Sequence, residues 1–179
     1  MKKIVIVNGS IAGLIVGAML FITAGMYYRN NNFDNGMMIG YATMIVAFSM
    51  IFTGIKSYRD KYNDGLISFG KAFKIGLYIT LIASTIYVVV WLIDYYCFLP
   101  DFGEKYATAM LQKLKAGGAS QAKIAALTKE MAWFTEMYKK PIFVVLFTYI
   151  EILPVGLIIT LISSFILKRK VKPAISISG

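Results

Sequence analysis

Four long apolar runs follow one another along the chain, and polar or charged stretches separate them. A run of about 20 mostly apolar residues is long enough to cross the hydrocarbon core of a bilayer as a helix. The pattern therefore predicts an all-α membrane protein with four transmembrane helices, built as a single membrane domain over residues 1–179. The predicted spans are about residues 4–28, 36–55, 75–93 and 142–167.

The fourth predicted span contains the one charge that lies inside an apolar run, Glu151, three residues before Pro154. The 18 Ile, Leu, Val and Phe residues of 142–167 favour insertion by about 5–11 kcal/mol, whereas a central carboxylate costs about 3 kcal/mol. The span therefore inserts with Glu151 in it. Because an ionisable group inside the membrane is a functional hypothesis by default, Glu151 and Pro154 are candidate functional residues.

Small residues in the first span predict a close helix–helix contact. Gly9, Gly13 and Gly17 recur every four residues, which stacks them on one helix face and lets another helix approach closely. Two interpretations stay open: an interface between copies of the chain, or packing against the other spans of the same chain.

A short internal echo links the third and fourth spans. Residues 76–84 read GLYITLIAS and residues 156–164 read GLIITLISS, with seven of nine positions identical. The echo places Thr80 and Thr160 at similar depth, where a hydrogen bond between the two spans is expected. A match of nine residues also arises by chance when both segments use few apolar residue types. It therefore does not by itself predict an inverted repeat of the transporter type.

The connection between the second and third spans is basic. Residues 56–74 hold five Lys or Arg and two Asp, and in the second half apolar and basic side chains fall on opposite helical faces. This pattern predicts an amphipathic segment at the lipid headgroups. Lys71 and Lys74 are candidate contacts for a lipid or an anion; the alternative is a plain lead-in helix.

Residues 101–140 are charged and Ala-rich, and they contain no spanning run. Two amphipathic stripes separated by the glycine pair 117–118 predict an extramembrane helical hairpin between the third and fourth spans. Asp101 and Glu104 resemble a capping box for its first helix, and Ser120 is a suitable cap for its second.

Basic residues set the expected orientation. With four spans both termini share one side, which holds 11 Lys and Arg against eight on the other. Because basic residues favour the cytoplasmic side, we predict cytoplasmic termini and an outside hairpin in a bacterial cytoplasmic (inner) membrane. These flanking residues also explain the net charge of +10, so nucleic-acid binding is not expected.

The composition of the chain excludes several kinds of catalytic and metal site. The chain has no His and a single Cys97, which removes the usual general base, an internal disulfide and any Cys-rich metal site. Catalytic sequence motifs are missing as well, so no metal, cofactor or enzymatic activity is expected. Asp94, at the end of the third span, is expected at the water interface.

Four stretches of the chain, taken together, resemble a known protein family. NGSIAGLIVGAML, GIKSYRD, ISFGKAFKIG and EILPVGLIITLIS together resemble a bacterial family of small integral membrane proteins, domain-of-unknown-function family 4199. The resemblance covers nearly the whole chain. It implies a four-span membrane protein without an assigned activity, and it carries over no catalytic or binding residue.

The first functional hypothesis is a structural or interaction component of the membrane. It is a compact four-helix bundle whose hairpin, glycine face or basic loop contacts lipids, a second copy or another membrane protein. The alternative is a small transporter or channel in which Glu151 takes up and releases a proton. A Glu151→Gln variant separates them, because only transport loses its coupling. A membrane enzyme is a third and weaker hypothesis.

Overall fold

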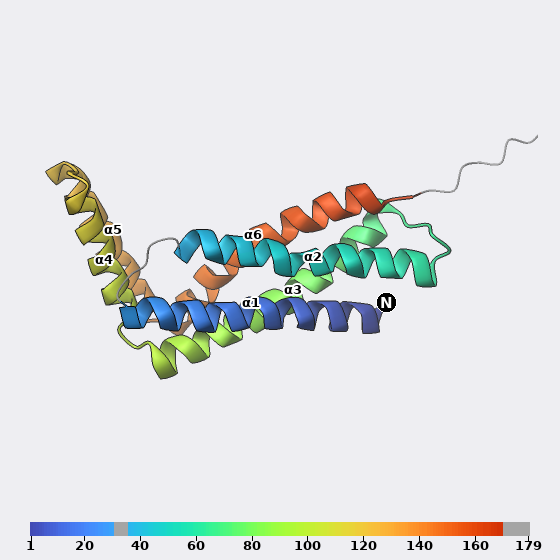
Figure 1. Cartoon of the computed structure of the whole chain (residues 1–179), viewed down its shortest axis with the longest axis horizontal. Coiled ribbons are helices and arrows are strands. Elements are labelled where there is room, and N and C mark those ends of the chain that lie inside the picture. The colour runs from blue at the N-terminus through green and yellow to red at the C-terminus, as the bar shows by residue number, and fades with distance from the viewer. Residues whose placement is uncertain (31–35, 170–179) are drawn as a thin grey trace, which may run out of the picture.

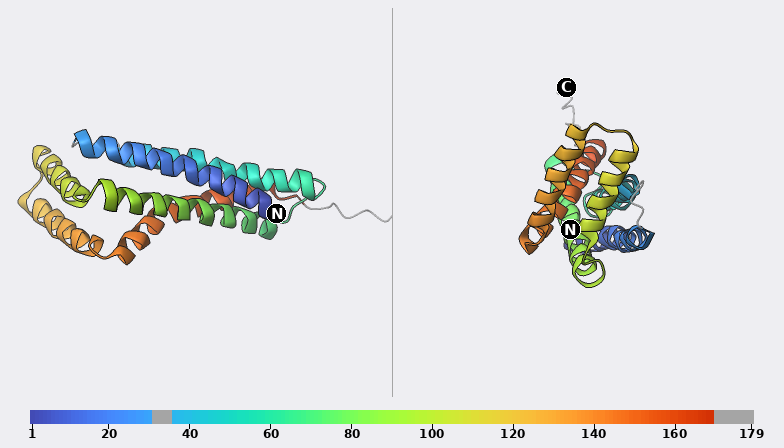
Figure 2. Two further views of the ribbon diagram at one scale, coloured as in Figure 1. Left: turned by 90° about the horizontal axis from the view of Figure 1, so that it is seen from below. Right: turned by 90° about the vertical axis from the view of Figure 1, so that its left-hand side faces the viewer.

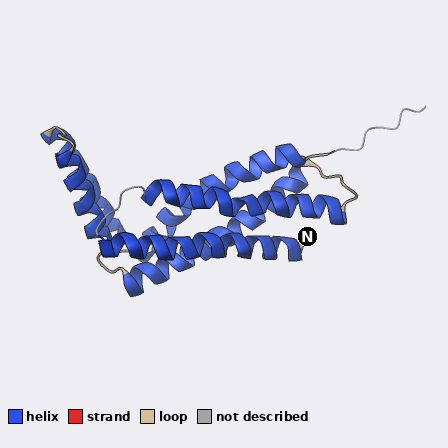
Figure 3. Cartoon of the chain, in the orientation of Figure 1, coloured by secondary structure: helices blue, strands red, loops and turns tan. Residues whose placement is uncertain are grey.

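The computed structural model describes residues 1–30 and 36–169, and over these residues it contains helices and no strands (Figure 3). The helices in chain order are α1 (Lys2–Asn30), α2 (Gly36–Tyr62), α3 (Phe69–Ile93), a turn of π-helix η1 (Asp94–Phe98), α4 (Phe102–Ala116), α5 (Gln121–Tyr138) and α6 (Pro141–Leu167).

Four of the described helices are long and apolar enough to cross a membrane: α1, α2, α3 continued by η1, and α6. They run lengthwise along the molecule, with the start of α1 and the end of α6 at the same end (Figure 1). The first long helix therefore begins, and the last one ends, on the same side of the molecule, as four crossings require. Lys170 and Lys172, which enter the predicted orientation, lie outside the described residues.

The basic connection is more helical than the sequence suggested. α2 continues to Tyr62 and α3 begins at Phe69, capped by the Ser68 hydroxyl, which accepts a hydrogen bond from the Lys71 backbone N–H at 3.3 Å. The predicted amphipathic lead-in is therefore the first part of α3 itself rather than a separate interfacial helix. Its apolar side chains extend the seam that α3 already presents to its neighbours.

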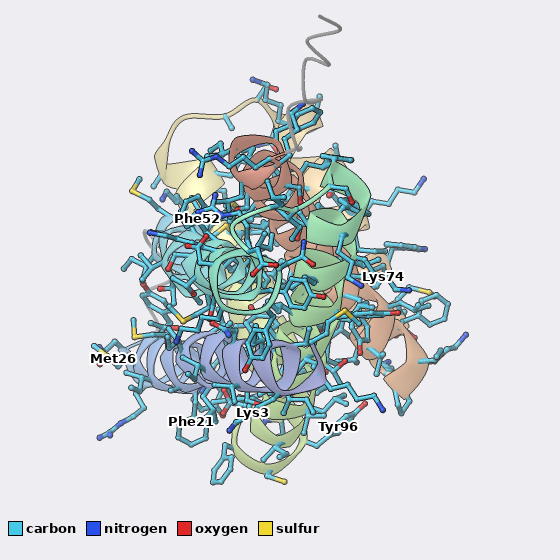
Figure 4. All side chains as sticks on the ribbon, turned by 90° about the vertical axis from the view of Figure 1, so that its right-hand side faces the viewer. Lys3, Phe21, Met26, Phe52, Lys74 and Tyr96 are labelled. Atoms are coloured by element: carbon cyan, nitrogen blue, oxygen red, sulfur yellow. The ribbon has the colours of Figure 1, made fainter. Side chains whose placement is uncertain are left out.

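α3 makes the most extensive contacts of the long helices, since it packs closely against α1 and α6 and also against α2. Its neighbour-facing side is buried, as at Ile75, Ile79 and Ala83. Large apolar side chains also cover the outside of the long helices, where Met26 of α1 points outward (Figure 4). An exposed apolar surface of this extent is typical of contact with another apolar phase, here the lipid of a membrane.

α4 and α5 lie alongside each other across the end of the long helices that is opposite the termini (Figures 1 and 2). α4 ends just before Gly117, and Gly118 adopts the left-handed conformation (φ +70°) that favours glycine. The predicted cap of α5 is confirmed, since the Ser120 hydroxyl accepts a hydrogen bond from the Lys123 backbone N–H at 3.4 Å.

The capping box predicted for α4 is wrong. The Asp101 side chain makes no capping hydrogen bond. Its carboxylate instead accepts a hydrogen bond from the Tyr28 hydroxyl at the end of α1 and forms an ion pair with Lys105, 3.5 Å away. A partner from a distant helix therefore replaces the local backbone contact.

The opposite end of the molecule is fastened by backbone hydrogen bonds. The Ile67 N–H donates to the Arg169 carbonyl at 3.0 Å, and the Arg169 N–H donates to the Ile67 carbonyl at 2.8 Å. The Arg59 guanidinium also donates to the Leu167 carbonyl at 3.5 Å. These contacts, which we call the terminal clasp, join the connection between α2 and α3 to the chain that leaves α6.

Candidate functional site

The glycine face of α1 packs against α3. A Cβ atom at Gly9 would lie 2.8 Å from Ile82, and one at Gly13 would lie 2.6 Å from Ile86. At Gly17 it would lie 2.9 Å from the side chain of Val90. The three glycines thus permit a close approach within the chain, which favours the second of the two interpretations and leaves this face unavailable to a second copy.

The echo motifs of α3 and α6 meet in the core. The Thr80 and Thr160 hydroxyl oxygens are 3.1 Å apart, and both side chains are fully buried. Gly76 lies against Thr160, and Gly156 lies against Thr80. Each glycine therefore makes room for the threonine of the other helix, and the hydrogen bond between the two helices is present.

Glu151 and Tyr87 form a polar pair between α6 and α3. The Tyr87 hydroxyl donates to a Glu151 carboxyl oxygen at 3.4 Å. Tyr87 is buried, whereas the Glu151 side chain is exposed and lines a cavity. α6 runs through Pro154 as one helix, and Pro154 is not among the residues that line this cavity.

The cavity has a volume of about 750 Å³ and lies between the long helices and the α4–α5 pair. Its wall comes from α1, α2, α3, α4 and α5, with Glu151 as the contribution of α6. Eight of the described lining residues are aromatic and five are methionines, while only Glu151 and Lys113 carry a charge. Size and apolar wall are typical of a small-molecule site, for which volumes of about 300–1,000 Å³ are usual.

Aromatic contacts hold α4 and α5 over the cavity. The rings of Trp91 and Phe102 meet edge to face, with centroids 5.1 Å apart, which fixes the start of α4 against α3. Phe147 of α6 stacks on Phe134 at 5.4 Å and on Tyr138 at 5.9 Å. Burial raises the pKa of Tyr138 to about 12, and nearby Glu151 adds to the shift, so this hydroxyl keeps its proton.

Asp94 lies in the protein interior, and its expected place at the water interface is wrong. Only 1% of its surface is exposed, and its Oδ2 atom has no hydrogen-bond partner. Asp94 follows Tyr87 by seven residues and Trp91 by three, which places it on the same buried face of α3. Helical position therefore decides its environment more than its distance from the end of the apolar run.

Lys71 and Lys74 lie far from the cavity, in the first turns of α3 near the terminal clasp. Both are exposed, and their ammonium groups lie 5.7 Å and 5.9 Å from the ring centroids of Tyr58 and Tyr78. Figure 4 shows Lys74 pointing outward at this end of the molecule. The structure does not bring the two lysines together with Glu151.

Sequence reasoning found Glu151 and missed the rest of the cavity wall. The aromatic residues belong to five helices and fall one or two to a helix, so no local spacing relates them. The single available signal was depth: Tyr87 lies 11 residues before the end of η1, which continues α3, and Glu151 lies 10 residues after the start of α6.

The family model described as "Protein of unknown function (DUF4199)" matches residues 8–169. Searches of curated proteins and of solved structures find no match. The family match covers most of the chain, and the four long apolar helices agree with the resemblance seen in the sequence. The chain belongs to the DUF4199 family of proteins of unknown function.

Proposed function

We propose that the protein is an interaction component of the bacterial cytoplasmic membrane. In this proposal it is a four-helix membrane bundle with cytoplasmic termini and an outside α4–α5 hairpin, and it holds an apolar ligand beneath that hairpin. One observation carries the proposal: the cavity of about 750 Å³ with a mostly apolar wall drawn from six helices.

The wall suits a ligand that comes from the membrane. Methionines from α1, α2 and α4 line it, and their unbranched, polarizable side chains adapt to ligands of irregular shape. A ligand with an apolar body partitions into the bilayer before it binds. The exposed residues Met37 and Met38, at the start of α2, border the cavity and lie where such a ligand would enter.

Trp91 offers a direct test, because it lines the cavity and is only 8% exposed. The chain has two tryptophans, so a Trp133→Phe variant leaves Trp91 as the single reporter. We expect an amphiphile with a brominated acyl chain to quench Trp91 fluorescence in a saturable way.

Glycines supply the matched controls. A Cβ atom at Gly40, Gly103 or Gly25 meets no other atom within 4 Å, and only Gly40 and Gly103 line the cavity. Gly40→Leu and Gly103→Leu should therefore fill the cavity and abolish the quenching, whereas Gly25→Leu should retain it. Equal quenching in all three variants would show that the acyl chain reaches Trp91 by another route.

Proton-linked transport is the second candidate, and the position of Glu151 in the cavity wall, hydrogen-bonded by Tyr87, supports it. Infrared spectroscopy of the carboxyl stretch across pH, wild type against Glu151→Gln, tests it. A Glu151 band that titrates near neutral pH favours transport. A Glu151 carboxyl that does not titrate in this range favours the interaction role.

A further inference from the structure

The charges of the cavity wall are unevenly placed: Glu151 carries the negative charge at one end, and no basic lining residue lies beside it. Of the described lining residues only Lys113 is basic, and it lies 11 residues after Phe102 in α4, roughly 16 Å along the helix at 1.5 Å per residue. Phe102 packs on Trp91, one helical turn from the Tyr87 that donates to Glu151. A cationic group is therefore favoured at the Glu151 end, where an anionic group would be repelled.

The polar wall near the long helices presents acceptors. The Thr23 hydroxyl donates to its own helix at the Met19 carbonyl, 2.7 Å away, and the Thr43 hydroxyl donates to the Ile39 carbonyl, 2.8 Å away. Both hydroxyl oxygens then offer the cavity lone pairs only. A ligand group that donates hydrogen bonds or carries positive charge fits them.

The aromatic rings of the cavity wall are the third feature that favours a cationic ligand. Tyr87, Trp91 and Tyr138 line the cavity together with Glu151. A cation within about 6 Å of an aromatic ring face is attracted by the ring quadrupole, and several rings around one carboxylate form the arrangement that recognises organic ammonium groups. A metal ion would instead need several oxygen, nitrogen or sulfur ligands, and the described residues include no group of three or more His, Cys, Asp or Glu side chains that could hold one.

We propose that the cavity binds an organic ammonium cation with an apolar body, with its charged head between Glu151 and the rings of Tyr87 and Trp91. This inference rests on the proposed function and adds the chemical class of the ligand. The ammonium group belongs either to an ethanolamine lipid headgroup or to a free lipophilic amine, and the two sources share this chemistry.

Three probes of equal chain length test the head group: decyltrimethylammonium, decanol and decanoate. Each competes with the brominated amphiphile for the Trp133→Phe protein in a maltoside detergent, which carries no charge. We expect the ammonium probe to bind at least about tenfold more tightly than decanol, which corresponds to about 1.4 kcal/mol, and decanoate to bind most weakly.

Glu151→Gln should remove the preference for ammonium, so that the ammonium probe and decanol bind with similar affinity. Tyr87→Phe, which keeps the carboxyl and removes its hydrogen-bond donor, should retain part of the preference. Measurable decanol binding by each variant shows that it is folded. The inference is overturned if decanol or decanoate binds as tightly as the ammonium probe, or if Glu151→Gln keeps the preference.

The outcomes separate this inference from the proposed function. If none of the three probes binds the wild type, the cavity is not a ligand site and both fail. If all bind equally, the cavity binds apolar ligands and only the ammonium class is wrong.

Mass spectrometry of lipids retained during purification identifies the source of the ammonium group. Phosphatidylethanolamine held by the wild type and lost in Glu151→Gln supports the lipid headgroup. Tight binding of the ammonium probe without retained phosphatidylethanolamine supports a free amine.

Discussion

Asp101 connects the start of α4 to the end of α1 through its carboxylate. The hydrogen bond from Tyr28 holds the pKa of Asp101 below its ordinary value of 3.8, and the charge of Lys105 lowers it further. The Lys105 ammonium also lies 3.6 Å from the centroid of the Tyr28 ring. Because the pKa is lower in the folded protein, this contact stabilises the fold above the unfolded pKa and is lost as pH falls through the folded one.

A Tyr28→Phe variant tests this contact. We expect it to unfold at a lower temperature than the wild type at neutral pH, because the carboxylate loses its main partner. As the pH falls below 3.8 the difference should shrink, because Asp101 then becomes protonated in the unfolded chain and, at still lower pH, in the folded wild type. Thermal unfolding of both proteins in detergent, as a function of pH, measures this difference in unfolding temperature.

Tyr96→Phe is the matched control, because Tyr96 is exposed near the same end of the molecule. It should change neither the unfolding temperature nor its pH dependence. A Tyr28→Phe difference that stays constant from pH 7 to the acid range would contradict a role for the Asp101 carboxylate.

Residues of this kind mark the limit of what the sequence predicts. The caps at Ser68 and Ser120 depend on neighbours three residues away, and such contacts follow from local spacing. Asp101 has the same local pattern, yet its partner lies 73 residues away. A distant hydroxyl that binds a carboxylate leaves no trace in the local sequence.

At the scale of helices, α3 and α6 approach closely through reciprocal glycine–threonine contacts. A Cβ atom at Gly76 would lie 2.7 Å from the Thr160 methyl group, and one at Gly156 would also press on Phe48, 3.0 Å away. Neither contact leaves room for another methyl group, since both neighbourhoods are buried. The two helices would have to separate to accept a larger residue.

Gly76→Ala and Gly156→Ala should therefore each destabilise the protein by about 1–3 kcal/mol through overpacking. Gly25→Ala is the matched control, because a Cβ atom there meets nothing within 4 Å. It should be neutral or stabilising, since Ala favours a helix by about 1 kcal/mol over Gly. Thermal unfolding in detergent compares the three variants, and equal midpoints would show that the crossing tolerates a methyl group.

The helices themselves were largely predictable, because apolar length and period are properties of one segment. The contact between Thr80 and Thr160 was also accessible, since the echo places two polar groups at one depth. The cavity was not predictable, because its volume depends on how six helices are placed relative to one another. The packing of Trp91 against Phe102, together with Tyr106 and Met110 in the cavity wall, shows that α4 covers this space.

At the scale of the whole molecule, the described helices place the termini at one end and the α4–α5 pair at the other (Figure 1). The distribution of basic residues leads us to expect the terminus end in the cytoplasm. Because Cys97 is the single cysteine, a Cys97→Ser background allows one cysteine to be introduced at either end.

In that background, Ala116→Cys and Lys3→Cys report on opposite ends, and both positions are exposed. We expect a membrane-impermeant maleimide to label Ala116→Cys in intact cells and Lys3→Cys only after the membrane is opened. The reverse labelling would invert the orientation. Labelling of both in intact cells would contradict the three crossings that separate the two positions.

The terminal clasp has a mechanical consequence. It ties the α2–α3 connection to the end of α6, while the cavity lies at the opposite end of the same helices. A helix of 27 residues such as α6 is about 40 Å long, so a tilt of about 5° at the clasp moves its other end by about 3–4 Å. Because the clasp fixes this end of α6, any change in the tilt of the helix would be largest at its other end, beside α4 and α5.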